Sequence, residues 1–199
     1  MFTVKFKKLH KDATLPSKAH PTDVGYDVRS VRCEYDVEKD VYIYYTGLAC
    51  ETEFEDNGYV HSCYGYLRSS NCKKEAYLTN HVAIVDSDGY RGEIQARFKN
   101  RTSLQTMIDI ETNKRVLQEL LKPFTRFASS FDNSLYNRIY EQTRNEFIER
   151  AKNLEFAPYE VGDKCIQFVF TKEEIVDIVE VDELSDSIRG TGGFGSTGV

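Results

Sequence analysis

The chain has 199 residues and a formal net charge of −6. This length predicts one domain of ordinary size, or one domain that carries an insertion. The acidic balance argues against a general nucleic-acid-binding protein, but it allows a nucleotide substrate held by a local cluster of donors. No apolar run is long enough to span a membrane, and residues 1–12 lack the pattern of a signal peptide, so we expect a cytoplasmic protein without membrane contact.

The chain has five cysteines and four histidines. An odd number of cysteines without a C-x-x-C pair is typical of reduced thiols, and of neither a disulfide framework nor a zinc site. The histidines show no metal-ligand spacing with the cysteines either.

The first hundred residues predict many short strands joined by tight turns. Tyr, Val, Ile and Phe occur in short runs that Gly, Asp, Asn and Ser interrupt. The runs include VKFKKL, DVYIYY, YVHSCYGYL and EIQARF. Residues 159–184 return to this pattern with CIQFVF and EIVDIVEV.

Between these two regions, from about Thr112 to Leu154, the apolar residues fall at helical spacing. We expect two helices that pack against each other as a hairpin, the second about 20 residues long, with Pro123 ending the first and Asp132 or Asn133 capping the second. The apolar positions are Val116, Leu117, Leu120, Leu121, Leu135, Ile139, Phe147, Ile148 and Ala151. A helical segment inside an all-β pattern is more often a loop insertion than part of the sheet's core.

Residues 189–199 read RGTGGFGSTGV and are too rich in glycine to pack a core. Backbone N–H groups without neighbouring side chains suit phosphate oxygens, hydroxyls add donors, Arg189 adds a planar charged fork and Phe194 adds a flat apolar face. The composition alone fits a disordered linker equally well. A nucleotide P-loop is a poorer match, because the segment has no Lys and no helix follows it.

Four further stretches carry polar groups beside strands or turns. PTDVGYDV (21–28) has two carboxylates around Gly25, and YLRSSN (66–71) has an Arg and two hydroxyls after a strand. LTNHVAIVDSDGYRGEI (78–94) predicts a hairpin, and VGDKCIQFVF (161–170) predicts a strand with one amide, Gln167. Each alone has a structural explanation: solvated acids, a helix cap, or an amide bonded to backbone.

Taken in order with the glycine-rich segment, these stretches resemble the five motifs of the homotrimeric dUTP pyrophosphatases, the dUTPase family. The resemblance implies a mainly β fold, a dUTPase-like distorted jelly-roll β-barrel formed by residues 1–101 and 157–188, with an α-helical insertion at 102–156 and a mobile lid at 189–199. It implies Mg²⁺-dependent hydrolysis of dUTP to dUMP and pyrophosphate by attack of water on the α-phosphorus. Such an enzyme keeps uracil out of DNA and supplies dUMP for dTMP synthesis. The family also implies a homotrimer whose active sites combine motifs from more than one subunit.

The same resemblance assigns roles to single residues. Asp86, six residues after Asn80, matches the carboxylate that activates water, and Asp27 matches the one that holds Mg²⁺ through water. Asn80 would read uracil, Tyr90 would lie under the deoxyribose, and Phe194 would stack on the base. The other implied substrate contacts are Arg68, Ser69, Ser70, Gln167, Arg189, Gly195, Ser196 and Thr197.

The chain departs from the family pattern in four places. Leu67 replaces a proline, and Ala83 replaces a glycine. An extra residue separates Asp86 from Tyr90, which a turn with Gly89 at positive φ would absorb and which makes Asp88 a second candidate base. The fourth departure is the helical insertion.

Two other functions stay open at this point. A dCTP deaminase shares the fold and an Arg-Ser-Ser motif, although the hairpin with Tyr90 and the glycine-rich segment favour the pyrophosphatase. A protein-interaction module would use the scaffold to present the helical insertion to a protein partner.

Overall fold

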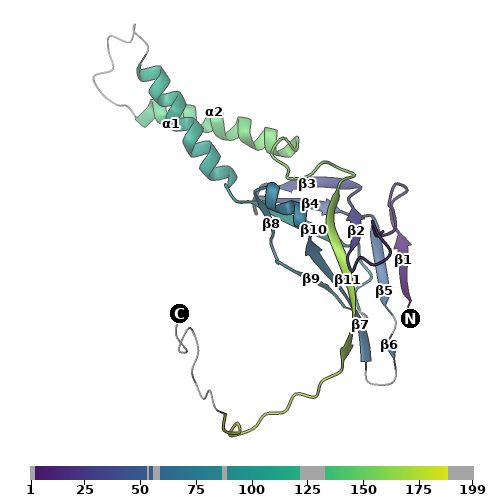
Figure 1. Cartoon of the computed structure of the whole chain (residues 1–199). Coiled ribbons are helices and arrows are strands. Elements are labelled where there is room, and N and C mark those ends of the chain that lie inside the picture. Colours follow the sequence, from purple (N-terminus) through teal and green to yellow (C-terminus); the bar gives the residue numbers. More distant parts are fainter. Residues whose placement is uncertain (1–2, 53, 56–58, 87–88, 122–132, 188–199) are drawn as a thin grey trace.

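The fold of the chain is mainly β, as expected (Figure 1). The computed structural model describes residues 3–52, 54–55, 59–86, 89–121 and 133–187. The strands are β1 (Val4–Lys8), β2 (Tyr26–Arg29), β3 (Arg32–Asp36), β4 (Val41–Tyr45), β5 (Leu48–Thr52), β6 (Phe54–Glu55), β7 (Tyr59–Leu67), β8 (Ala76–Leu78), β9 (Ala83–Val85), β10 (Gln95–Asn100) and β11 (Lys164–Glu174). The helices are the 3₁₀-helix η1 (Ser69–Lys73), α1 (Leu104–Leu120) and α2 (Asn133–Lys152).

The strands form three antiparallel groups that enclose one core. One sheet has the order β3-β4-β10-β8, the second has the order β2-β11-β7-β6 with β9 added to β7, and β1 pairs with β5. Burial alternates along β7, where every second residue from His61 to Gly65 is buried, as expected for a strand with one face against a core. The largest fully buried apolar side chains are Tyr44, Leu48, Leu78, Phe98, Ile166 and Phe168.

The described residues of segment 78–94 are not paired with each other as in the predicted hairpin. β9 pairs with β7, whereas the next strand, β10, begins only at Gln95 and pairs with β4 and β8. The prediction was wrong because alternating apolar residues show that a strand is present, but they do not show which strand is its partner.

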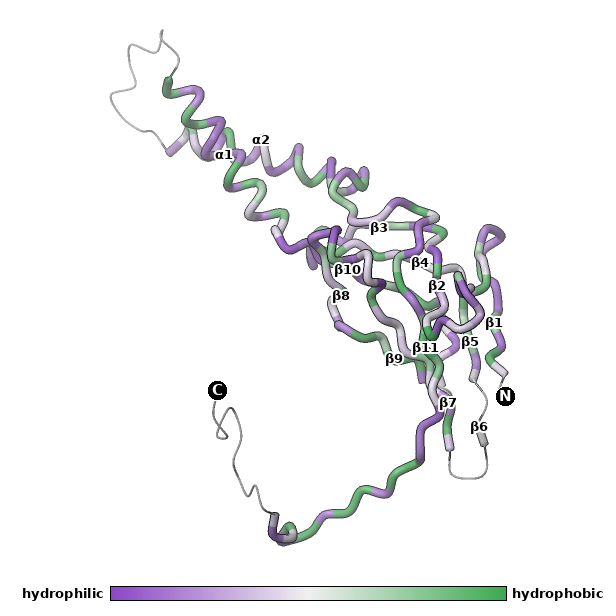
Figure 2. The backbone as a smooth tube through the Cα atoms, in the orientation of Figure 1, coloured by the Kyte–Doolittle hydropathy of each residue, from purple (hydrophilic) through white to green (hydrophobic). Residues whose placement is uncertain are grey.

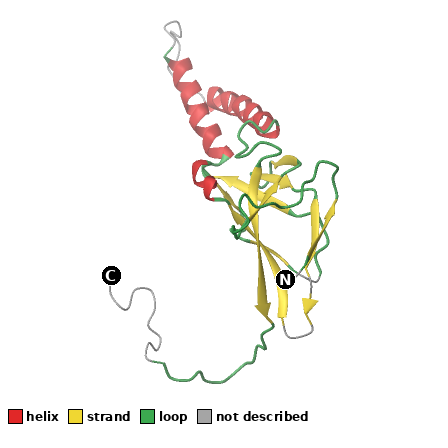
Figure 3. Ribbon diagram, turned by 45° about the vertical axis from the view of Figure 1, so that its right-hand side comes forward, coloured by secondary structure: helices red, strands yellow, loops and turns green. Residues whose placement is uncertain are grey.

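The two predicted helices are confirmed and project together from one end of the barrel (Figures 1 and 3). α1 begins at Leu104, eight residues earlier than predicted, because the side chain of Ser103 accepts a hydrogen bond from the Thr106 N–H and caps the helix. The base of α1 is also held by the barrel: the Leu104 N–H donates to the carboxylate of Asp40 at 3.1 Å, and the Tyr35 hydroxyl donates to the same carboxylate at 2.7 Å. Asp40 has φ of 53° in the turn between β3 and β4.

The helices pack against each other through residues spaced four apart. The buried positions are Leu104, Ile108, Thr112 and Val116 in α1, and Ile139, Thr143, Phe147 and Ala151 in α2. An ion pair between Arg115 and Glu146, with 2.8 Å between Nη1 and Oε2, joins the two helices beside this seam.

Leu117 and Leu121 lie outside the seam, contrary to the prediction, and are 56% and 72% exposed. The error arose because the seam includes the polar Thr112, so the spacing of apolar residues alone indicated the wrong face of α1.

After β11 the chain continues as an arm, residues 175–187, that runs away from the barrel (Figure 1). Apolar and polar residues alternate along this arm (Figure 2). All of its large apolar side chains are exposed: Ile175, Val176, Ile178, Val179, Val181 and Leu184. None of the described helices is long and apolar enough to cross a lipid bilayer.

Candidate active site

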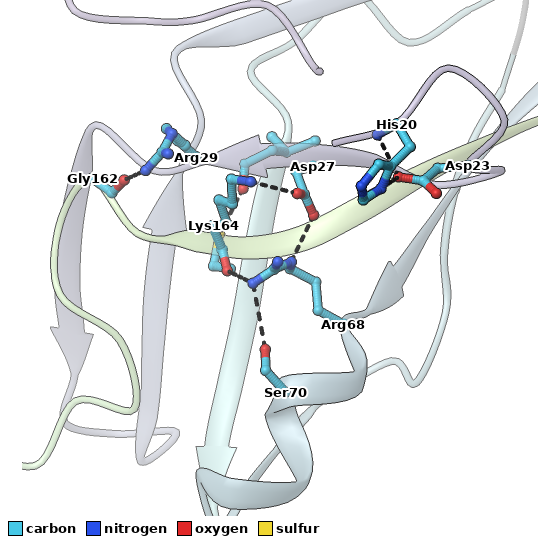
Figure 4. A network of polar contacts seen from close by, with 10 residues as sticks. His20, Asp23, Asp27, Arg29, Arg68, Ser70, Gly162 and Lys164 are labelled. Carbon is cyan, nitrogen blue, oxygen red and sulfur yellow. Dashed lines mark hydrogen bonds and ion pairs between the residues drawn. The ribbon is translucent and has the colours of Figure 1, made fainter. Parts of the chain in front are cut away.

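Asp27 is clamped between two cations that come from distant parts of the chain (Figure 4). Its Oδ1 accepts from Arg68 Nε at 2.6 Å, and its Oδ2 accepts from Lys164 Nζ at 2.8 Å. Arg68 Nη1 also donates to the carbonyl of Lys164 at 3.3 Å. The network therefore joins β2, the end of β7 and β11 at one point.

The ionised form of Asp27 is stabilised by these contacts. Burial alone raises the pKa of this carboxyl and is the largest single effect. The hydrogen bonds and charges of Lys164 and Arg68 outweigh it and lower the pKa below the ordinary value of 3.8. One carboxylate between two cations leaves this three-residue network with a formal charge of +1, and Asp23 adds a second carboxylate to the pocket beside it.

A pocket of about 340 Å³ opens beside this network. Three of the motif-bearing stretches meet in its wall, and the lining residues are Ala19, Asp23, Val24, Gly25, Asp27, Arg68, Ser69 and Gln167. Asp23 is fixed by its own backbone turn, because its carboxylate accepts from the His20 N–H at 2.8 Å. Residues from 21–28, 66–71 and 161–170 therefore meet in one pocket of this chain.

Gln167 sits opposite Asp27 in the register of β11 and β2. Its Nε2 donates to the carbonyl of Leu67 at 3.0 Å, so backbone is one partner of this amide. Its Oε1 lies so close to Gly25 that a Cβ at position 25 would collide with it. Gly25 is therefore required for the close approach of the loop before β2 to the amide.

The Arg-Ser-Ser stretch begins the short helix η1 directly after β7. Ser69 is exposed in the pocket wall, and the Ser70 hydroxyl lies 3.4 Å from Arg68 Nη1. Neither serine caps η1 through its side chain, since the residue at the cap position is Arg68 and it makes no side-chain cap hydrogen bond. The two serine hydroxyls therefore do not cap the helix, which was the structural explanation considered for this stretch.

The residues around Asp27 fit Mg²⁺ only as a site in which water and substrate phosphates supply most of the ligands. Among the described residues, no group of three or more His, Cys, Asp or Glu side chains is placed to hold a metal ion. Mg²⁺ commonly uses one or two carboxylates and takes its other ligands from water and substrate phosphates. The pocket offers two carboxylates, Asp23 and Asp27, and Asp27 would fit that pattern through a bridging water.

Asn80, Asp86 and Tyr90 lie apart from this pocket. The described lining of the pocket includes none of them, and all three are exposed. Asn80 is in the turn between β8 and β9, where the Val82 N–H donates to its carbonyl at 2.6 Å. Asp86 follows the end of β9, and its side chain faces away from the core.

Tyr90 folds back on its own segment. Its hydroxyl donates to the carbonyl of Glu93 at 2.8 Å, and a Cβ at Gly92 would lie 2.8 Å from the tyrosine ring. Gly92 is therefore needed for this ring position. Gly89 has φ of 145°, which confirms the expected positive φ beside the extra residue.

The departure at Ala83 has a structural counterpart in the neighbouring strand. Ala83 of β9 is the register partner of Gly65 in β7. A Cβ at position 65 would lie 3.1 Å from the Ala83 Cβ, so glycine in β7 provides the space that alanine occupies in β9.

Lys164 is the residue of this site that the sequence did not reveal. It lies three residues before Gln167 in the same stretch, but its role depends on an irregularity in the pairing of β11 with β2 between Lys164 and Ile166. Asp88 and the implied contacts of the glycine-rich segment lie outside the described residues; these are Arg189, Phe194, Gly195, Ser196 and Thr197.

Comparison with known proteins points to one family. The family model described as dUTPase matches residues 11–146. A curated relative from Corynebacterium glutamicum, named deoxyuridine 5'-triphosphate nucleotidohydrolase, is 26% identical over 196 residues, which cover 98% of this chain and 94% of the relative. A relative of the same name from Alkaliphilus metalliredigens is 26% identical over 199 residues, covering 100% of this chain and 99% of the relative.

Solved structures show the same fold. The dUTPase of Staphylococcus bacteriophage 80alpha, solved with dUPNHPP, superposes with a TM-score of 0.60 at 24% identity and covers 99% of both chains. At 24% identity, this similarity shows that the two chains share a fold.

Proposed function

The chain belongs to the dUTPase family and is a dUTP diphosphatase, and from this premise we propose that it attacks the α-phosphorus of dUTP with a water molecule and with the help of Mg²⁺. The products are dUMP and pyrophosphate. The observation that supports this proposal best is the meeting of three separate motif stretches around the Arg68–Asp27–Lys164 network.

Asp86 orients and polarises the attacking water. A carboxylate is a weak base at neutral pH, but in phosphoryl transfer the nucleophile needs positioning more than full deprotonation. The position of Asp86 directly after a strand supports this role, because paired backbone up to Val85 fixes where the side chain begins.

The pocket beside Asp27 takes the triphosphate. Arg68 offers a charged fork, Ser69 and Ser70 offer hydroxyls, and Gln167 offers an amide. Bound Mg²⁺ would supply neutralisation of the triphosphate charge, and Asp27 would hold it through water.

Asn80 and the backbone of the turn between β8 and β9 read the uracil edge. His81, with φ of 60°, makes this turn tight. A closed turn of this kind offers donors and acceptors to the base and leaves no space for the methyl group of thymine. Tyr90 supports the deoxyribose, and residues 189–199 close over the substrate as a lid, with Phe194 on the base.

The active site is shared between the subunits of a homotrimer. Two features of the chain support this proposal. The exposed residues Asn80, Asp86 and Tyr90 are not among the described residues that line the pocket beside Asp27 in their own chain. The arm at residues 175–187 carries exposed apolar side chains away from the barrel, as a segment that packs on another subunit would (Figure 2).

The catalytic unit consists of residues 1–101 and 157–188, with residues 102–156 as the insertion. At the junction, Leu154 and Phe156 pack against the barrel core, and Asn100 Nδ2 donates to the Phe156 carbonyl at 2.8 Å. The helices proper therefore leave the barrel at Ser103 and return by Leu154.

One observation favours an added role of the insertion as a docking surface for a protein. Ile110, Leu117 and Leu121 of the α1 region are each more than half exposed. This role would accompany catalysis, because none of the described residues of the insertion lines the pocket beside Asp27.

A product assay tests the proposed reaction. The full chain is incubated with dUTP, dCTP, dTTP or UTP, with and without Mg²⁺, and pyrophosphate and ammonia are measured. We expect Mg²⁺-dependent pyrophosphate release from dUTP alone. Ammonia from dCTP would instead identify a deaminase, and equal rates with dTTP or UTP would refute the proposed base and sugar selection.

A further inference from the structure

The 3₁₀-helix η1 carries the Arg-Ser-Ser stretch and is held at two points. At its start, Arg68 donates to the Asp27 carboxylate at 2.6 Å and lies 3.4 Å from the Ser70 hydroxyl (Figure 4). In its middle, Asn71 is the only buried residue of the five in this helix and is 8% exposed. A 3₁₀-helix has poor hydrogen-bond geometry of its own, so the position of such a short one depends on these anchors.

The Asn71 amide is fixed by two partners. Its Nδ2 donates to the Ala76 carbonyl at 2.7 Å, and its Oδ1 accepts from the Tyr159 hydroxyl at 2.8 Å. A carbonyl oxygen can only accept a hydrogen bond, so the amide has only one orientation that satisfies both partners. Burial raises the pKa of Tyr159 to about 12, which keeps its hydroxyl protonated and able to donate.

Tyr159 is itself held by the core, in the segment between α2 and β11. Its N–H donates to the Tyr44 hydroxyl at 2.9 Å, and that hydroxyl donates to the Tyr159 carbonyl at 2.7 Å. The centroid of the Tyr159 ring lies 6.1 Å from that of Tyr44 and 5.2 Å from that of Phe98. Tyr44 and Phe98 are fully buried, so the Tyr159 hydroxyl reaches η1 from a closely packed part of the barrel.

We propose that Tyr159 is a positioning residue for dUTP binding: its hydroxyl holds the Asn71 amide and thereby keeps η1 in the wall of the phosphate pocket. This inference rests on the proposed function, in which the pocket beside Asp27 takes the triphosphate. The described lining of that pocket includes Ser69 of η1 but neither Asn71 nor Tyr159, so these two act on it indirectly. Without the hydroxyl, Oδ1 of Asn71 would be buried without a partner, so the amide would turn toward water and shift η1.

The proposal predicts an effect on substrate binding more than on the chemical step. A triphosphate contact that is equally strong in the ground state and in the transition state changes KM and leaves kcat nearly unchanged. Asp86, the proposed base, is not among the described residues that line this pocket. Tyr159→Phe keeps the ring and removes the hydroxyl, so it should raise KM for dUTP about tenfold, with kcat within about threefold of wild type.

Steady-state kinetics of the full chain with dUTP and Mg²⁺ test the proposal. Tyr35→Phe is the matched control, because it removes the same group from a tyrosine that donates to Asp40 at the base of α1, and KM should stay within about twofold of wild type. A purely structural role of Tyr159 would lower the free energy of unfolding in urea and leave KM of the folded protein unchanged. An unchanged KM in Tyr159→Phe, or an equal rise in Tyr35→Phe, would overturn the proposal.

A double-mutant cycle tests the route through Asn71. Asn71→Ala should raise KM at least as much as Tyr159→Phe does, and the double variant should show no further rise. If the two effects on KM multiply, Tyr159 does not act through Asn71 and the proposal is wrong. Where Asn71→Ala does not fold, Tyr159→Phe decides the question, because phenylalanine still fills the same space in the core.

Ser69→Ala separates this inference from the proposed function. Ser69 lines the pocket, so loss of its hydroxyl should raise KM if the triphosphate binds there. If Ser69→Ala raises KM and Tyr159→Phe does not, the positioning role is wrong and the proposed pocket stands. If neither variant raises KM, the pocket does not take the triphosphate and both proposals fail.

Discussion

The barrel and the helix pair differ in whether their buried polar groups are hydrogen-bonded. In the barrel, the hydroxyls of Thr46 and Thr52 donate to backbone carbonyls, and the Asn71 amide donates to the Ala76 carbonyl at 2.7 Å. In the helix pair, the hydroxyls of Thr112 and Thr143 are buried on facing positions and have no hydrogen-bond partner. All of the described residues that line the pocket beside Asp27 also belong to the barrel. The buried polar groups of the barrel thus hold its backbone in place, and other polar groups of the barrel line the pocket. The two buried threonine hydroxyls of the helix pair do neither.

This difference predicts that changes in the barrel and its lid alter turnover, while changes in the helix pair alter stability alone. The largest effect should come from Asp86→Asn, which keeps the side-chain shape and removes the base. We expect kcat to fall at least about a hundredfold while dUTP still binds, measured by pyrophosphate release and by calorimetry. Asp88→Asn is the matched control and should retain near-normal turnover. The reverse result would show that the base was misassigned.

The second-largest effect should come from changes in the lid, residues 189–199. A chain that ends after Ile188 should fold, because residues 189–199 cannot pack a core, and should lose most hydrolysis. A stacked aromatic contributes roughly 1 to 3 kcal/mol per base, so Phe194→Ala alone should lower kcat/KM about ten- to a hundredfold. Phe194→Tyr keeps the aromatic face and should retain most activity. Full activity of the truncated chain would mean that this segment is only a linker.

Asp27 should link barrel stability to pH. Its pKa is lowered in the folded state, so the stabilisation by its ion pairs is present above the unfolded value of 3.8 and is lost as pH falls through the lower folded value. Asp27→Asn leaves Arg68 and Lys164 facing each other without a carboxylate. We expect its deficit in unfolding free energy, measured in urea, to be constant above about pH 5 and to shrink in more acidic solution. A deficit that does not change with pH would argue against the ion pairs as its cause.

In the helix pair, Thr112→Val and Thr143→Val should be stabilising. Valine has the shape of threonine without the hydroxyl, and an unsatisfied buried hydroxyl costs about 1 to 3 kcal/mol. Chemical denaturation should therefore show a gain of about 1 kcal/mol for each variant, with kcat/KM unchanged. The control Thr46→Val, in the barrel, breaks the hydrogen bond to the Ile94 carbonyl and should be destabilising. A loss of stability in Thr112→Val would show that its hydroxyl is satisfied in solution.

The smallest effect should follow replacement of residues 104–152 by a short Gly/Ser loop. This range keeps Leu154 and Phe156 on the barrel core, and closing a surface loop is entropically cheap. We expect kcat/KM for dUTP within about tenfold of wild type. Phe147→Ala is a milder companion variant, because it weakens the helix cluster and leaves the barrel intact. Loss of folding in the loop variant would mean that the helices belong to the core of the barrel.

Much of the barrel and part of the site could be predicted from the sequence. The short strands and the two helices follow from periodicity, and the stretches 21–28, 66–71 and 161–170 were recognised by their resemblance to the dUTPase motifs. Lys164 and the pairing of β9 with β7 could not be predicted, because both depend on strand register, which is set by contacts between residues far apart in the chain. The seam of the helix pair was missed for another reason: two of its eight buried positions are threonine.

Because Asp40 fixes the start of α1 to the barrel, a small rotation at this contact becomes a larger displacement at the far end of the helix pair. α1 has 17 residues and is about 25 Å long, and its first N–H is fastened to a turn of the barrel. A tilt of about 5° at that turn would move the far end of α1 by roughly 2 Å. A force on the far end of the helix pair is therefore transmitted to the turn between β3 and β4 through the carboxylate of Asp40, which also accepts a hydrogen bond from the Tyr35 hydroxyl.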